Sequence, residues 1–322
     1  MKVLIIGGGA IGQLFAHHLG RGGAAVHVLV RPHQAAALSA GGVVYPLNRP
    51  RRTRTNPVPL HVTVHTDQDA ALALGFDLVV LAVSSVALRT GDWLARLGAQ
   101  RGDAHILGLQ AGADDSALVA EHVPDAQLAW GMLSVISLHA PLPGEARTPP
   151  GVAFWFPPLA PLGFSGPNGV VTPILAVLTA GGMPVRRVPD LRTRLLFTGP
   201  LLDKTVQALE AVGWSFRALR SDPEVLRLAV RAMNEAWTLA EATTGATRPV
   251  ALWGVHPLLL RGALALAPRL VPFNLERFFT VHFTKVGAQT VALADAQLAR
   301  AAEAGIAMPA SAALLSRVRA RR

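Results

Sequence analysis

Residues 3–19 read VLIIGGGAIGQLFAHHL, and this stretch decides the fold. The apolar run at 2–6 is short, rich in branched side chains and ended by glycine, which predicts a buried parallel strand. Residues 10–22 have the apolar spacing of a helix, and residues 25–31 (AVHVLVR) predict a second strand. A strand, a glycine turn, a helix and a further strand are typical of a parallel, doubly wound sheet.

The glycine turn has the pattern Gly7-x-Gly9-x-x-Gly12, which predicts a dinucleotide site. The first glycine allows a tight turn, the second lets the backbone approach a pyrophosphate, and the third lets the helix pack closely on the strand. The following helix offers free N–H groups and the positive end of its dipole to the phosphates. We therefore expect the cofactor to contact Gly7, Gly9, Ala10, Ile11 and Gly12.

The end of the second predicted strand indicates which dinucleotide binds. NAD sites usually carry an acidic residue there, which accepts a hydrogen bond from the ribose 2′-OH. This chain has Arg31 at that position. A guanidinium can pair with a 2′-phosphate, so the sequence favours NADP(H). The other interpretation is a solvated arginine at a strand end. The arginines at 49–54 (RPRRTR) could reinforce the phosphate site, although we favour a solvated loop for them.

The rest of the chain divides into two predicted domains. Further strands of the sheet are expected at 60–65, 77–83 and 105–110, whereas residues 32–59 are expected to be loop-rich. Strand-like pieces from about 127 to 188, around a helix at 171–182, could extend the sheet at one edge. Helices are expected at 190–213, 222–244 and 273–304, with a break or kink at Pro200. We predict a Rossmann-type dinucleotide-binding domain over residues 1–188 and an all-helical domain for substrate binding and dimerisation over residues 189–322.

Composition excludes several classes of function. The chain has 322 residues and no cysteine, so disulfides, thiolate nucleophiles and Cys-ligated metals are excluded. Its spacing of histidines and acids predicts no metal site. The net charge is +10, but the basic residues are mostly scattered arginines, so nucleic-acid binding is only a third, weaker interpretation. Arg261 interrupts the most apolar stretch, and glycines interrupt the first one, so we expect no membrane span or signal peptide and a cytoplasmic location.

Several segments resemble the ketopantoate reductase (2-dehydropantoate 2-reductase) family. MKVLIIGGGAIGQLFAHHLGRGG with VHVLVR resembles its amino-terminal segment, and DLVVLAVSS and ILGLQAG resemble its fourth and fifth strands. AEAGIAMP at 302–309 resembles its carboxyl-terminal Gly-Ile-x-x-Pro signature. The resemblance implies an NADPH-dependent oxidoreductase that reduces the ketone of a small 2-oxo acid, in pantothenate biosynthesis, with a Rossmann domain and a helical domain.

The resemblance also implies roles for particular positions. The family's strand-four Lys falls on Ser84, and its Q-N-G motif falls on Gln110-Ala111-Gly112, so we expect Ser84 and Gln110 to contact the cofactor. The catalytic Lys falls on Arg194, the Asn four residues later on Thr198, the late Glu on Gln289 and the late Ser near Arg277. A cation near the ketone stabilises the charge that hydride transfer builds on oxygen, which is the role we expect for Arg194. Thr198 and Gln289 are expected to contact the substrate.

The source of the proton is open at this stage, because arginine is a poor proton donor. Lys204 and Lys285, two of only three lysines, are candidate donors, and His256 and His282 are further possibilities. Because no position of the family's catalytic set keeps its residue, the alternative is an NADP(H)-binding sensor or partner-binding protein without reductase activity. The apolar helical surface makes a homodimer possible.

Overall fold

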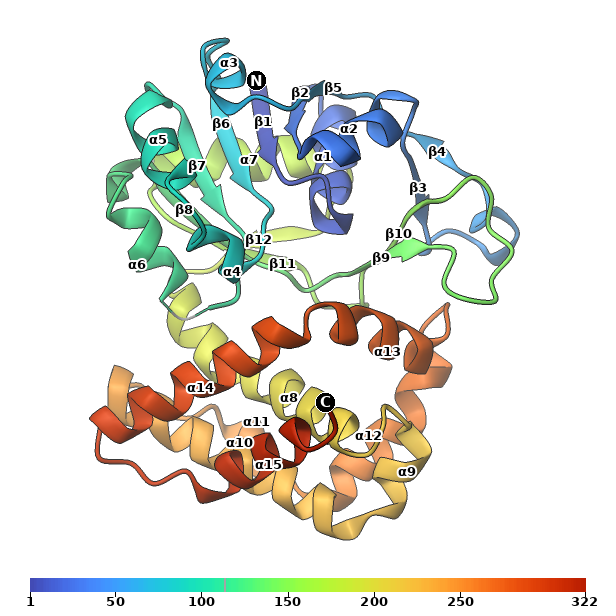
Figure 1. Ribbon diagram of the computed structural model, residues 1–322, viewed down its shortest axis with the longest axis vertical. Helices are drawn as coiled ribbons and strands as arrows, with labels where there is room; N and C mark the ends of the chain where they lie inside the picture. The colour runs from blue at the N-terminus through green and yellow to red at the C-terminus, as the bar shows by residue number, and fades with distance from the viewer. Residues whose placement is uncertain (113) are drawn as a thin grey trace. The chain divides into compact units, whose positions relative to one another are not determined.

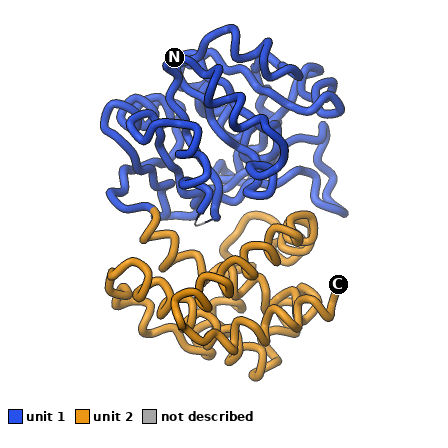
Figure 2. Tube along the Cα trace, turned by 60° about the vertical axis from the view of Figure 1, so that its left-hand side comes forward, with its two compact units in different colours: residues 1–191 blue, residues 192–322 orange. Residues whose placement is uncertain are grey.

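The computed structural model describes residues 1–112 and 114–322. The chain forms two compact units, residues 1–191 and 192–322 (Figure 2). The first unit is built on sheets and the second is helical (Figure 1), which confirms the predicted fold class. The sequence-based prediction placed the domain boundary after residue 188.

Unit 1 contains an eight-stranded main sheet in the order β12-β11-β8-β7-β6-β1-β2-β5. Neighbouring strands are parallel from β5 to β8, and β11 and β12 run in the opposite direction at one edge. Chain order reverses between β1 and β6, so the topological switch point lies there. The strands are β1 (Lys2–Ile6), β2 (Ala25–Leu29), β5 (Thr63–His65), β6 (Leu78–Leu81), β7 (His105–Gly108), β8 (Leu128–Met132), β11 (Leu162–Ser165) and β12 (Val185–Arg187).

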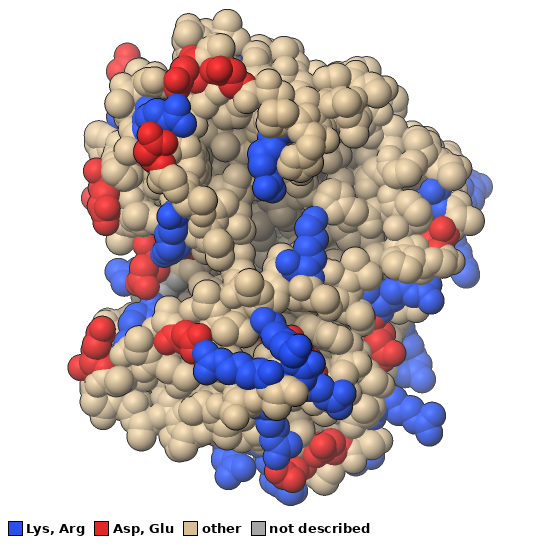
Figure 3. Space-filling model, viewed as in Figure 1, with Lys and Arg blue, Asp and Glu red and all other residues tan. Residues whose placement is uncertain are grey.

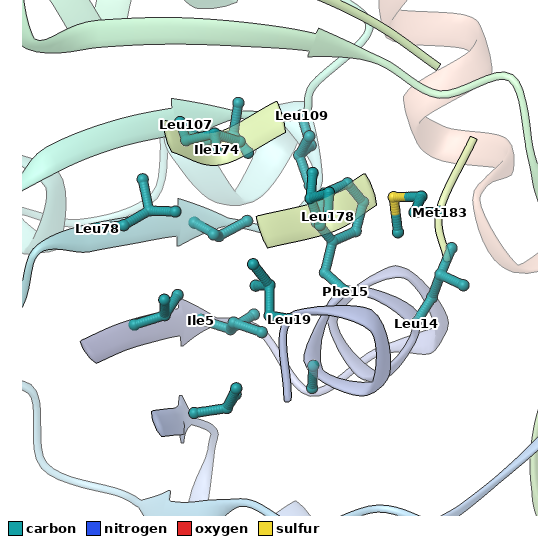
Figure 4. Packing of buried hydrophobic residues seen from close by; sticks show 14 of the residues in the cluster. Ile5, Leu14, Phe15, Leu19, Leu78, Leu107, Leu109, Ile174, Leu178 and Met183 are labelled. Atoms are coloured by element: carbon teal, nitrogen blue, oxygen red, sulfur yellow. The ribbon is translucent and has the colours of Figure 1, made fainter. Parts of the chain in front are cut away.

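Helices cover both faces of the main sheet because side chains of its central strands alternate between two cores. Ile5 belongs to the core with α1 and α7, and Leu4 belongs to the core on the other face. Figure 4 shows Phe15 and Leu19 of α1 and Leu178 of α7 packed on that first face. The helices are α1 (Ala10–Arg21), α2 (Pro32–Ser39), α3 (Gln68–Leu72), α4 (Ser85–Leu88), α5 (Trp93–Gln100), α6 (Asp115–Ala120) and α7 (Asn168–Ala180), with short 3₁₀ turns at Arg51–Thr53 and Asp125–Gln127.

A second sheet packs against α1 and was not predicted. Its order is β4-β3-β10-β9, from Val58–Pro59, Val43–Pro46, Gly151–Trp155 and Ile136–Ala140. The prediction that residues 32–59 are loop-rich is therefore wrong, since they form α2, β3 and β4. The segment 127–188 extends the main sheet only in part, because β9 pairs with β10, and β10 pairs with β3 instead of a strand of the main sheet.

Unit 2 consists of helices around a core between α10 and α15. They are α8 (Leu191–Ala211), α9 (Phe216–Ser221), α10 (Pro223–Thr244), α11 (Val250–Trp253), α12 (Pro257–Leu270), α13 (Leu275–Lys285), α14 (Gly287–Glu303) and α15 (Pro309–Arg319). Of the break or kink predicted at Pro200, the break is wrong, because α8 continues through Pro200, and the kink stays a prediction. The predicted helix at 273–304 is two helices, α13 and α14.

None of the helices in the described ranges is alone both long and apolar enough to cross a membrane. One pair, α12 with α13, meets the criteria of length and composition together, and it is bent by 103° at the break between them.

Candidate functional site

The glycine turn after β1 has the geometry that its spacing predicts. Gly7 has a φ of +114°, and a Cβ there would lie 2.6 Å from the Ala82 carbonyl oxygen. A Cβ on Gly12 would lie 1.9 Å from the Gly7 carbonyl oxygen, because the helix packs directly on the turn. A Cβ on Gly9 would meet nothing within 4 Å. Packing of the protein itself therefore requires Gly7 and Gly12, whereas Gly9 borders open space that a ligand could enter.

The amino terminus of α1 can receive an anion. Gly9 caps the helix and has no side chain to accept a hydrogen bond, and the first turn contains no acidic residue. The first N–H groups of a helix lack partners within it, and here Ala10 and Ile11 are only partly buried. The turn is held by Gln13, whose Nε2 donates to the Gly8 oxygen at 2.9 Å, and by Ser137, whose Oγ donates to the Ala10 oxygen at 3.0 Å. These features fit a pyrophosphate.

Arg31 and this turn both lie at the carboxyl ends of parallel strands of the main sheet. β1 and β2 pair in parallel with Ile6 opposite Leu29, and Arg31 follows β2 and caps α2. Its side chain is exposed and makes no hydrogen bond or ion pair with any residue that the structure describes. An unpaired guanidinium at this position can receive the 2′-phosphate of NADP(H).

The arginine-rich segment that follows β3 has its own internal contacts. Arg54 Nε donates to the carbonyl oxygens of Leu47 and Arg49, at 2.9 and 3.1 Å. Arg51 and Arg52 are exposed. On the face of the molecule in Figure 3, basic side chains are spread out and interspersed with acidic ones.

Ser84 and Gln110 lie where the chain leaves β6 and β7. Ser84 is exposed and caps α4, its Oγ accepting from the Ala87 amide at 3.2 Å. Gln110 is buried, and its Nε2 donates to the oxygens of Leu81 and Val83 at 2.8 and 2.9 Å. The Gln110 amide therefore joins the ends of the two strands, which positions the loops beside the switch point.

A buried carboxylate beside these loops was missed at the sequence level. Asp115 is fully buried, and its Oδ2 accepts from Ser85 Oγ at 2.6 Å and from the Gly112 amide at 2.7 Å. Its Oδ1 accepts from Arg89 Nη1 at 2.6 Å. We call Asp115, Ser85, Arg89 and Gly112 the Asp115 lock. The only local signal was an aspartate shortly after a loop glycine, which is common at helix starts.

The candidate substrate residues lie in unit 2 on three helices. Arg194 and Thr198 are exposed on the first turns of α8, where Thr198 Oγ1 donates to the Arg194 oxygen at 2.9 Å. Lys285 is exposed at the end of α13, and Gln289 is half-buried near the start of α14. Arg277 lies in the first turn of α13. These side chains make no hydrogen bond or ion pair with one another among the described contacts.

Lys204, on the same helix as Arg194, is enclosed by protein. It is 1% exposed, and its Nζ lies 2.6 Å from Gln297 Oε1 and 3.0 Å from Asp203 Oδ2. The contact with Gln297 connects α8 to α14, and both contacts favour a structural role.

The two candidate histidines also have partners, since His256 Nδ1 accepts from the Leu258 amide at 3.3 Å and His282 stacks on Phe278. No group of three or more His, Asp or Glu side chains in the described ranges is arranged to hold a metal.

A doubly wound sheet with this glycine turn between its first strand and helix is typical of the class of dinucleotide-binding proteins. Residues 3–160 match the family described as Ketopantoate reductase PanE/ApbA. This amino-terminal segment belongs to the ketopantoate reductase family, a family of oxidoreductases, as a divergent member.

Solved structures similar in fold cover nearly the whole chain. A PanE/ApbA family ketopantoate reductase from Ralstonia eutropha JMP134 has a TM-score of 0.72 and 19% identity, covering 100% of this chain and 98% of that one. A 2-dehydropantoate 2-reductase from Geobacter metallireducens GS-15 has a TM-score of 0.75 and 19% identity over 100% of both. D-mandelate dehydrogenase, in a ternary structure with NADH and anilino(oxo)acetate, has a TM-score of 0.76 and 12% identity, covering 100% and 98%. None of the curated proteins matches the sequence.

Proposed function

We propose that the protein is an NADP(H)-dependent reductase that acts on the ketone of a small 2-oxo acid or a related carbonyl compound. The observation that carries the cofactor preference is the exposed, unpaired Arg31 beside a glycine turn that is open at Gly9. The substrate class is supported by the family, and by the similar fold of D-mandelate dehydrogenase, whose solved complex contains NADH and anilino(oxo)acetate.

Different residues of this chain bind the cofactor, stabilise the charge on the substrate and donate the proton. NADPH, when bound, supplies the hydride that goes to the carbonyl carbon. The glycine turn and the start of α1 hold the pyrophosphate, and Arg31 holds the 2′-phosphate. The guanidinium of Arg194 stabilises the negative charge that develops on the carbonyl oxygen, while Gln289 donates a hydrogen bond to the substrate and Thr198 contacts it. The oxygen then takes a proton, for which exposed Lys285 is a better placed donor than buried Lys204.

The test is a screen of 2-oxo acids with NADPH oxidation as the readout. For any substrate found, Arg194→Ala should lower kcat/KM by about 100-fold, the usual effect of removing one donor to a developing oxyanion. Arg192→Ala is the matched control, because Arg192 is exposed on the same turn of α8 and points away from Arg194. Equal activity of the two variants would remove Arg194 from the mechanism.

A second candidate function is an NADP(H)-binding sensor without reductase activity. Ala111 and Gln289 favour it, since the first has no polar side chain and the second no charge, at positions where the family carries polar or charged groups. Tight NADPH binding with no turnover of any carbonyl compound in the screen would support this candidate over the reductase.

A further inference from the structure

The Asp115 lock lies beside the carboxyl ends of the parallel strands of the main sheet, where the dinucleotide is expected. β1, β6 and β7 pair in parallel, so the loops that follow β6 and β7 leave the carboxyl ends of the strands, as the glycine turn after β1 does. The lock joins these two loops, because Ser85 begins α4 after β6 and Gly112 follows β7. Ligands of doubly wound sheets bind outside the carboxyl ends of the strands at the switch point, here between β1 and β6.

A continuous set of contacts runs from the glycine turn to the lock. A Cβ on Gly7 would lie 2.6 Å from the Ala82 oxygen, so the turn packs directly on the loop after β6. Gln110 donates to the oxygens of Leu81 and Val83 in the same loop. Asp115 then connects the far end of this loop to the loop after β7. The backbone of residues 82–84 and 110–112 is thereby held in place relative to the phosphate-binding turn.

Burying the Asp115 lock is unfavourable, and its most exposed member is an arginine. Asp115 has no exposed surface, whereas the Arg89 side chain is 47% exposed. Taking a carboxylate out of water is unfavourable unless hydrogen bonds replace the water, and here three donors do so. A Cβ on Gly112 would lie 2.4 Å from Asp115 Oδ2, so the lock also requires glycine at that position.

The two halves of a bound dinucleotide would contact loops that follow different strands of the main sheet. Arg31 follows β2, on one side of the glycine turn, and the locked loops follow β6 and β7, on the other. If the adenosine half lies over β2, the nicotinamide half lies over the locked loops. Among the described residues of the second loop, Ala111 is exposed and offers only backbone groups for hydrogen bonding.

We propose that Asp115 is a positioning residue for the nicotinamide half of the cofactor: by locking Ser85, Arg89 and Gly112, it orients the backbone of both loops toward the nicotinamide. This inference rests on the proposed function, because it assumes that the edge binds NADP(H). The lock acts through backbone groups and does not itself contact the reacting atoms.

The experiment compares two ligands by calorimetry, NADPH and 2′,5′-ADP, which contains only the adenosine half with its 2′-phosphate. In Asp115→Asn we expect the Kd for NADPH to rise about tenfold and the Kd for 2′,5′-ADP to stay within about twofold of wild type. Ser85→Ala, which leaves Arg89 and Gly112 on the carboxylate, should show the same selective weakening to a smaller extent. Asp69→Asn is the matched control, since it removes an exposed Asp–Arg pair with Arg96 in the same unit.

A purely structural role would weaken both ligands together, and this outcome in Asp115→Asn and Ser85→Ala would overturn the proposal. Unchanged NADPH affinity in both variants would also overturn it, while leaving the cofactor assignment intact. If Asp115→Asn does not fold, Ser85→Ala alone decides between these results. Failure of the wild-type protein to bind either ligand would instead refute the proposed function, and the positioning role with it.

Discussion

Acidification should destabilise unit 1 through two buried histidines on α1. His17 and His18 are 4% and 2% exposed and pack against Phe154 of the second sheet. The pKa of each ring is lowered from 6.5 to about 4, chiefly by burial. For His17, nearby positive charge, mainly from His18, contributes to this lowering. For His18, the hydrogen bond of Nδ1 to the Gly181 oxygen, at 2.9 Å, partly opposes it.

The sign follows from which state binds protons. Between pH 6.5 and pH 4 the unfolded chain protonates both rings, while the folded protein keeps them neutral. Their contribution to stability is thus fully present above pH 6.5 and is lost as the pH falls toward 4. Protonation of each ring in the unfolded chain lowers the free energy of unfolding by about 2 kcal/mol at pH 5. The decrease reaches about 3 kcal/mol for each ring at pH 4.

The assay is urea denaturation at pH 7 and pH 5 for wild type, His17→Leu and His33→Leu. We expect the loss of unfolding free energy between the two pH values to be about 2 kcal/mol smaller in His17→Leu than in wild type. His33 is exposed on α2 of the same unit, so His33→Leu should lose as much as wild type. An equal loss of unfolding free energy in wild type and His17→Leu would show that His17 does not cause the acid sensitivity.

Three further predictions concern packing and capping. Gly12→Ala places a Cβ 1.9 Å from the Gly7 oxygen, so we expect a loss of about 3 kcal/mol or more in chemical denaturation, and unchanged stability would contradict this. Glu235→Gln removes the carboxylate that accepts from two backbone amides at the start of α15, at 2.7 and 2.8 Å, and should cost about 1 kcal/mol in thermal unfolding; an unshifted Tm would be the contrary result. Lys204→Met should cost about 1–3 kcal/mol and leave NADPH affinity unchanged, whereas lost turnover at full stability would identify Lys204 as the proton donor.

Local signals predicted the parts of the fold that local chemistry determines. The glycine turn, α1 and β2 follow from residues close together in sequence. The helix expected at 222–244 is α10: Asp222 caps it, its Oδ1 accepting from the amides of Glu224 and Val225, and the helix ends at Gly245 with a φ of +69°. Each of these features depends on neighbours within one or two turns, and sequence patterns record such dependence directly.

Long-range pairing explains what the sequence did not predict. The second sheet joins β3 to β10, with Val44 opposite Val152, and such short strands are stable only once they pair and pack on α1. The Asp115 lock depends in the same way on contacts between two loops. α12 was noted as an apolar stretch and not as a helix, because prolines at 257 and 268 obscured its helical spacing.

The assignment of NADP(H) to the glycine turn and Arg31 is tested most directly by calorimetric binding of NADPH and NADH to wild type, Arg31→Ala and Arg186→Ala. Arg186 is the matched control, an exposed arginine on β12 at the far edge of the main sheet. We expect wild type and Arg186→Ala to bind NADPH more tightly than NADH, and Arg31→Ala to lose this preference because only its affinity for NADPH falls. Equal affinity of wild type for both cofactors, or an unchanged preference in Arg31→Ala, would contradict the assignment of the 2′-phosphate to Arg31.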